Sequence, residues 1–158
     1  MLCCQLSISI DKPFRKLVDE AWLGRIVEYT LGRKGVDAAV ELGLVVTNSR
    51  RIQRLNKRYR GRDEATDVLS FALLEGDASP FIPPPDGVLH LGEVILCYPQ
   101  AVAQAEEHRH PLERELALLA VHGVLHLLGH GDEDAEAEAE MRAEEERILE
   151  GLEEDALL

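Results

Sequence analysis

The spacing of apolar residues divides the chain into alternating strands and helices. Apolar and polar residues alternate over residues 4–10, which predicts a half-buried strand. Asp11 and Pro13 follow, and over residues 14–29 the apolar positions recur every three or four residues. This spacing predicts an amphipathic helix that opens at Asp11 and ends at Gly32.

Three further runs, rich in valine and leucine, predict strands at residues 41–47, 67–74 and 88–98. Between the first two of these runs, Asn48 or Ser49 can cap a helix that continues to about Arg58. The segment 76–86 contains four prolines, which cannot continue a helix or a sheet ladder, so we expect an exposed loop there.

Prolines also mark the start of two more helices. Pro99 opens a helix to about Glu107, and Pro111 opens a long apolar helix that ends at Gly129. Residues 134–152 are strong helix formers with a thin apolar stripe, which predicts an acidic surface helix that frays at its end.

These elements predict an α+β fold in a single domain spanning residues 1–158. We expect about four strands in a mixed sheet, a buried central helix, and other helices around it. Hydrophobic residues make up 46% of the sequence, which is typical of a globular protein and not of a disordered chain.

Two histidines in the predicted central helix point to a metal site. His122 and His126 are four positions apart, so they share one helix face with Cβ atoms about 5–6 Å apart. Two imidazoles at that spacing can reach one ion, with ligand bonds of about 2 Å. A lone histidine in an apolar helix is usually an ordinary core residue, but this pair, followed by a glycine and further ligands, favours a metal.

A third ligand must come from beyond a turn. Residue 130 would lie about 12 Å further along a straight helix than His122, too far for one ion. Gly129 and Gly131 permit the chain to turn back. Both His130 and Asp132 then remain candidates for the third ligand.

Charge is distributed very unevenly along the chain, whose formal net charge is −13. Residues 132–155 hold thirteen acidic residues against two arginines, a net charge of −11. Seven of the 17 basic residues lie within residues 50–62: Arg50, Arg51, Arg54, Lys57, Arg58, Arg60 and Arg62. This basic segment can hold a phosphate backbone, although a charge cluster alone is more often only a solvated helix face.

Nothing in the sequence predicts export or a membrane span. Residues 1–10 have no cationic leader, and the longest apolar run is shorter than the roughly 20 residues that cross a bilayer. Cys3, Cys4 and Cys97 do not form a disulfide or metal-binding pattern. We therefore expect a cytoplasmic protein without a membrane partner.

Two separated motifs resemble those of the YbeY family of bacterial endoribonucleases, also called rRNA maturation factors. The first is LNKRYR at residues 55–60, followed by TDVLSF at 66–71, and the second is HGVLHLLG at 122–129. Between them, LGEVILC at residues 91–97 is similar to the family's strand. Together with the length and the order of elements, the resemblance covers nearly the whole chain.

The resemblance implies a metal-dependent, single-strand-specific endoribonuclease that acts in 16S rRNA 3′-end maturation and ribosome quality control. Its implied partners are single-stranded RNA, a 16S rRNA precursor, and the ribosome or its small subunit, with a ribosomal protein as a further partner. Its implied cofactor is one divalent ion held by three histidines spaced H-x3-H-x5-H, with Zn²⁺ favoured, and an arginine matching Arg60 is thought to act in catalysis.

This sequence departs from that pattern at the third ligand. The matching position is Asp132, and His130 lies two residues earlier. Asp is an accepted zinc ligand, so we favour Asp132 over His130, but an anionic ligand leaves the identity of the metal open.

Under this hypothesis Arg60 stabilises the charge that develops on the phosphodiester in the transition state. The RNA would be bound by the neighbouring basic residues and by Tyr59, which can stack on a base: Arg50, Arg51, Arg54, Lys57, Arg58, Tyr59 and Arg62. We expect Thr66 and Asp67 to hold the loop that follows Arg60.

Two other functions remain open at this stage. The histidine pattern also resembles the metzincin peptidases, but those enzymes place a glutamate base after the first histidine, where this chain has Gly123. Alternatively, the metal only stabilises a non-catalytic, ribosome-associated RNA-binding factor. A structural zinc usually has four protein ligands, so His130 would then join His122, His126 and Asp132.

Overall fold

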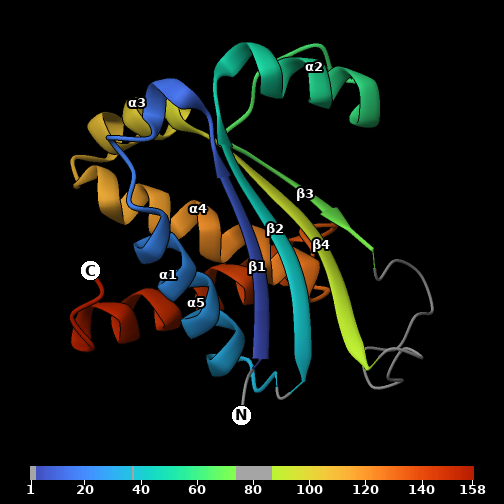
Figure 1. Cartoon of the computed structure of the whole chain (residues 1–158), viewed down its shortest axis with the longest axis vertical. Coiled ribbons are helices and arrows are strands. Elements are labelled where there is room, and N and C mark those ends of the chain that lie inside the picture. Colours follow the sequence, from blue (N-terminus) through green and yellow to red (C-terminus); the bar gives the residue numbers. More distant parts are fainter. Residues whose placement is uncertain (1–2, 37, 74–86) are drawn as a thin grey trace.

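The structure is a computed structural model and describes residues 3–36, 38–73 and 87–158. In chain order its elements are β1 (Cys3–Ile10), η1 (Lys12–Phe14), α1 (Glu20–Arg33), β2 (Ala39–Thr47), α2 (Ser49–Arg60), β3 (Val68–Ala72), β4 (Val88–Cys97), α3 (Tyr98–His108), α4 (Leu112–Leu127) and α5 (Ala135–Glu154). The predicted α+β class is confirmed (Figure 1).

The four strands form one mixed sheet in the order β1-β2-β4-β3. β1 pairs parallel to β2 and β2 parallel to β4, whereas β3 pairs antiparallel to β4 at the edge. The carboxyl ends of β2 and β4 therefore lie at the same end of the sheet, where α2 and α3 begin (Figure 1).

α4 is the buried central helix that the sequence predicts. It packs on β3 and β4 and is covered by α1, α3 and α5 (Figure 1). Its apolar side chains, such as Val121, Val124 and Leu125, are completely buried. Each such side chain contributes about 1.5–3 kcal/mol, so packing fixes the position of this helix firmly.

α2 covers the opposite face of the sheet, but only near the end of β4 and the start of β3. Ile52 of α2 is fully buried in a small cluster with Leu69, Ile95 and Cys97. This cluster places the basic segment above β3 and β4.

The first predicted helix differs from the structure. Asp11 and Pro13 begin only a short 3-10 turn, and α1 starts at Glu20. The carboxylate of Asp19 accepts hydrogen bonds from the backbone N–H groups of Ala21 and Trp22, at 3.0 and 3.3 Å. This N-cap satisfies free donors of the helix start, which the apolar spacing alone could not reveal.

The acidic helix predicted over residues 134–152 is present as α5 and ends two residues later than expected. α5 continues to Glu154, and Leu152 is fully buried, as are Ile148 and Leu149 to within 1%. Its apolar stripe packs against α4 and α1, so the helix is a firm outer layer. The predicted loop at 76–86 lies outside the described residues, and no helix that the structure describes could span a membrane.

Candidate active site

A cavity of about 500 Å³ lies between the end of α2, the start of β3 and the end of α4. The residues that line it include Arg60 and Arg62 from the end of α2 and the loop after it, and His122, His126 and Asp132 from α4 and the turn after it. The cavity thus brings together residues from three distant parts of the sequence.

The two histidines are adjacent on α4, as their spacing predicts. The ring centroids of His122 and His126 are 4.7 Å apart, and the ring planes meet at 69°. Both side chains are partly buried. Their common orientation into the cavity gives two nitrogen ligands for a cation.

The helix ends immediately after this pair, also as predicted. Gly129 adopts a backbone φ of 99°, a conformation that residues other than glycine rarely adopt. The N–H of His130 donates to the carbonyl of Leu125 at 3.0 Å. This turn sends the chain back toward the cavity and brings Asp132 to its wall.

His130 points elsewhere. It does not line the cavity, and the charges that act on it are those of Lys34, Glu144 and Glu140. Burial and, after it, the Lys34 ammonium lower the pKa of His130. Of the two candidate third ligands, the structure brings only Asp132 next to the paired imidazoles.

The electrostatic surroundings of the two imidazoles differ. Burial lowers the pKa of His122, but the hydrogen bond and the charge of Glu145 outweigh it, with smaller contributions from Asp67 and Asp132, so the pKa is raised. Burial and then the neighbouring His122 lower the pKa of His126, which favours the neutral ring that a metal binds. Two nitrogens and a carboxylate are a donor set that suits zinc and similar divalent ions.

Contacts with Ser70 and Phe71 hold the Arg60 side chain at the edge of the cavity. Its guanidinium donates to the backbone carbonyl of Ser70 at 2.5 Å and lies 5.4 Å from the centroid of the Phe71 ring. α2 ends directly after it, because Gly61 adopts a left-handed conformation with a φ of 73°. The Ser70 hydroxyl in turn donates to the carbonyl of Gly123 at 3.3 Å, which connects this rim to α4.

Gly123 lies where α4 approaches the sheet most closely. A Cβ atom at this position would collide with Val94 of β4 and would come within 3.3 Å of the Ser70 hydroxyl. A glutamate after His122, as in the metzincins, would therefore fit only if Val94 or the helix moved.

The other residues predicted to bind RNA are all exposed on or beside α2. Arg51 and Lys57 have acidic partners, at 2.9 Å from Asp11 and 3.6 Å from Asp63.

Tyr59 is 57% exposed, so its ring is accessible for stacking. It contacts Phe71 edge-on, with centroids 5.4 Å apart, and the Arg58 guanidinium lies 5.3 Å from its ring. Arg50 and Arg54 face solvent, whereas Arg62 lines the cavity.

Asp67 holds the chain where it enters β3. Its carboxylate accepts from the backbone N–H of Val68 at 2.8 Å, from the Thr66 hydroxyl at 3.3 Å and from the Gln104 amide at 3.2 Å. These bonds support the structural role expected for Thr66 and Asp67.

Sequence reasoning did not find a second histidine group, at the other end of α4. His108, His110 and Glu115 have ligand atoms that all lie within 4.8 Å of one another, so they could hold a metal ion. Within the described part of the chain this is the one group of three that meets that distance; the ligand atoms of His122, His126 and Asp132 do not all lie so close to one another. The signal in the sequence is the pattern H-x-H-x4-E, which is short and common.

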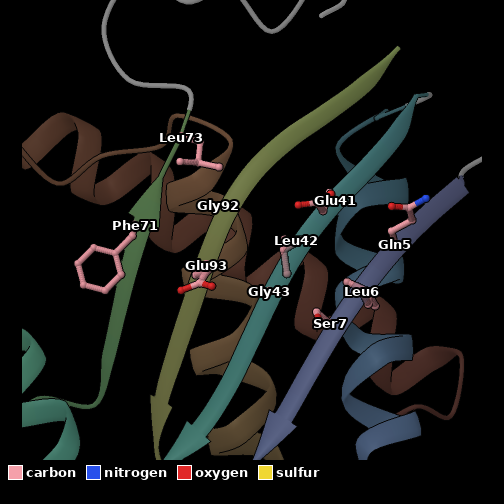
Figure 2. A pocket seen from close by; sticks show the side chains of 10 residues that line it. All are labelled: Gln5, Leu6, Ser7, Glu41, Leu42, Gly43, Phe71, Leu73, Gly92 and Glu93. Carbon is pink, nitrogen blue, oxygen red and sulfur yellow. The ribbon is translucent and has the colours of Figure 1, made fainter. Parts of the chain in front are cut away.

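A different cavity, of about 550 Å³, opens on the part of the sheet that α2 leaves uncovered. Figure 2 shows that its walls carry Gln5, Glu41 and Glu93 from three neighbouring strands, with Phe71 and Leu73 at one side. None of the described residues that line it is basic. Two carboxylates with no lysine or arginine among the described lining residues disfavour a phosphate backbone, so we do not assign RNA to this surface.

The fold and the cavity at the end of α4 define an α+β protein with a histidine and carboxylate site below a basic helix. Comparison with known proteins assigns its family: residues 8–153 match the family model described as endoribonuclease YbeY. The chain belongs to the YbeY family.

Its relatives and a solved structure agree with this assignment. An endoribonuclease YbeY of Roseiflexus sp. (strain RS-1) is 47% identical over 148 residues, which cover 93% of this chain and 92% of that protein. One from Dehalococcoides mccartyi (strain ATCC BAA-2266 / KCTC 15142 / 195) is 42% identical over 156 residues, covering 95% and 91%. The solution structure of TM1509 from Thermotoga maritima has a TM-score of 0.62 and 26% identity, covering 92% of this chain and 87% of that one.

Proposed function

We propose that this protein is a metal-dependent, single-strand-specific endoribonuclease that acts in 16S rRNA 3′-end maturation and ribosome quality control. It would work in the cytoplasm, from a single domain of residues 1–158, on a 16S rRNA precursor at the ribosome or its small subunit, with a ribosomal protein as a further partner. The observation that carries the proposal is the cavity that His122, His126, Asp132 and Arg60 share.

His122, His126 and Asp132 would hold one divalent ion, with Zn²⁺ favoured by two imidazoles and a carboxylate. Three protein ligands leave a position for water or substrate, and an ion bound there supplies Lewis acidity toward a phosphodiester and a more acidic bound water. Asp132 is exposed and follows a glycine turn, so its carboxylate can close on the imidazoles.

Arg60 would act on the RNA itself. A guanidinium has five N–H donors, and the bond to the Ser70 carbonyl uses one of them. The remaining donors can bind the non-bridging oxygens of a phosphate in the cavity, and these bonds strengthen as negative charge develops in the transition state.

The basic residues of α2 would track the RNA backbone outside the cavity. Arg50, Arg54 and Arg58 are exposed on the same helix that ends at Arg60. Tyr59, accessible and beside the cavity, would stack on an unpaired base, which accounts for a preference for single strands.

The alternative of a non-catalytic factor with a structural metal has less support. A closed structural site needs a fourth protein ligand, and His130 faces Lys34 and Glu144 instead of the cavity. A peptidase has less support still, because Gly123 supplies no glutamate base and a Cβ at this position would collide with Val94.

The test is cleavage of single-stranded RNA by metal-stripped and metal-restored protein. We expect cleavage only in the restored protein, and its loss in His126→Ala by about 1,000-fold or more, since a metal supplies several kcal/mol of transition-state stabilisation. His108→Ala, which removes a histidine from the other group, is the matched control and should stay within about twofold of the wild type. Cleavage that survives both stripping and His126→Ala would sink the proposal.

The same assay separates the role of Arg60 from that of its neighbours. Arg60→Ala should lower kcat by about 100-fold, as the loss of a transition-state donor does, with a smaller change in RNA affinity. Arg54→Ala should instead weaken RNA binding and leave kcat unchanged. The reverse result for Arg60 would make it a docking residue.

A further inference from the structure

One acidic residue of α5 is buried against the candidate metal site. The Glu145 carboxylate is hydrogen-bonded to Nδ1 of His122, across 23 residues of sequence. Glu145 is only 8% exposed, whereas its neighbour Glu146 is exposed. Because acidic residues are frequent throughout α5, the sequence alone does not reveal this difference in burial.

The bond determines which nitrogen of His122 can bind a metal. With Nδ1 occupied by Glu145, only Nε2 is available to an ion in the cavity that His122 lines. Glu145 itself does not line that cavity, so it cannot be a further ligand there. Its carboxylate can act on the site only through His122.

We propose that Glu145 is a positioning residue of the metal site. It holds the His122 ring in the tautomer that carries its proton on Nδ1 and presents Nε2 to the ion, and its charge makes that nitrogen a stronger ligand. This inference rests on the proposed metal site, and it gives α5 a function: the helix carries an outer partner of the metal.

The packing of α5 supports this role. Ile148 and Leu149 are 1% exposed and Met141 is 2% exposed, and they lie on the same side of the helix as Glu145 at spacings of three and four residues. The apolar stripe therefore fixes the carboxylate in place before an ion binds. A partner that is already in position costs no ordering entropy on binding.

The test is the dissociation constant for Zn²⁺, measured by competition with a chromophoric chelator. We expect Glu145→Ala to weaken binding by about 10–100-fold, the usual effect of removing such a partner. Glu145→Gln still accepts the Nδ1–H bond but lacks the charge, so its constant should lie between those of Glu145→Ala and the wild type. Glu146→Ala is the matched control and should bind Zn²⁺ like the wild type.

Two further readouts separate positioning from a purely structural role. At saturating Zn²⁺, RNA cleavage by Glu145→Ala should recover. Cleavage by His126→Ala should not recover under the same conditions. In the wild type, NMR of the ring nitrogens should show the His122 proton on Nδ1.

The outcomes distinguish the inference from the function on which it rests. If Glu145→Ala and Glu145→Gln both bind Zn²⁺ as tightly as the wild type, the inference is overturned but the proposed function is not. A lower melting temperature of either variant would not change this conclusion. No Zn²⁺ binding by the wild type would overturn both. If Glu145→Ala does not fold, Glu145→Gln, which keeps the volume and the hydrogen bond, decides the question.

Discussion

The two ends of α4 carry the same chemical groups in different settings. At its start, His108 and His110 meet Glu115; at its end, His122 and His126 share a cavity with Asp132. Glu115 is 1% exposed and lies 2.5 Å from Nε2 of His110. Asp132 is exposed, on a turn that follows Gly129.

The difference shows that proximity of ligand atoms is not by itself a sign of function. Ligands of a tetrahedral zinc ion lie about 3.3 Å apart, given bonds of about 2 Å. The 2.5 Å contact of Glu115 with His110 is a hydrogen bond and would have to open before an ion could enter. The group at the end of α4 is looser, but it faces a cavity that also holds Arg60. We therefore expect one bound ion per chain, at that end.

The sharpest test of this comparison is the third ligand. Asp132→Ala should weaken Zn²⁺ binding by more than about 100-fold, beyond the effect of removing an outer partner. Asp132→His should retain binding, because histidine is an equivalent ligand. His130→Ala should bind like the wild type, since His130 faces Lys34 and not the cavity. Loss of binding in His130→Ala, with binding kept in Asp132→Ala, would reverse the assignment.

The group at the start of α4 should contribute to stability instead. His110→Ala leaves the buried carboxylate of Glu115 without its closest partner, which costs about 2–3 kcal/mol of the free energy of unfolding. Chemical denaturation measures this change. Replacing both partners, as His110→Ala with Glu115→Leu, should recover part of the loss, because no buried charge remains.

The same variant also tests the number of ions. The Zn²⁺ content of His110→Ala should stay at that of the wild type after metal restoration. A fall in metal content, with RNA cleavage unchanged, would show that the start of α4 holds an ion of its own and that the comparison is wrong.

The sequence predicted the end of α4 better than its start, for a physical reason. His122 and His126 are four residues apart on one helix and are followed by Gly129, so local geometry alone brings the two rings together. His108 and His110 lie on either side of the end of α3, and they meet Glu115 only because α3 and α4 pack at a corner. Residues that meet where two helices pack at a corner do not recur at a fixed spacing, so no periodic sequence pattern reveals their contact.

The fold follows the same rule. The sequence predicted the strands and the central helix, apart from a few residues at their ends, because each is an apolar run bounded by residues that begin or end regular structure. It missed the start of α1, where the side chain of Asp19 decides between helix and loop. It also missed the contact of Glu145 with His122, because nothing local distinguishes one glutamate from its neighbours in an acidic helix.

The smallest expected effect concerns what holds α5 in place behind the cavity. The Lys34 ammonium donates to the Glu144 carboxylate at 3.1 Å, and this bond is the first cause that lowers the pKa of Glu144. Both side chains are partly exposed, at 24% and 21%, so the pair contributes only about 0.5 kcal/mol. Lys34→Met should remove that contribution at neutral pH while keeping the apolar stem.

The sign of its pH dependence follows from the lowered pKa. Because the carboxyl pKa of Glu144 is lower in the folded protein than in the unfolded chain, the stabilisation is complete above the unfolded value and is lost as the pH falls through the folded value. Denaturation curves of Lys34→Met and the wild type should therefore converge in acid. Zn²⁺ affinity of this variant at neutral pH should remain unchanged, because the buried stripe of Ile148, Leu149 and Leu152 positions the helix. Weaker Zn²⁺ binding in Lys34→Met would mean that the surface ion pair, and not the stripe, keeps Glu145 against His122.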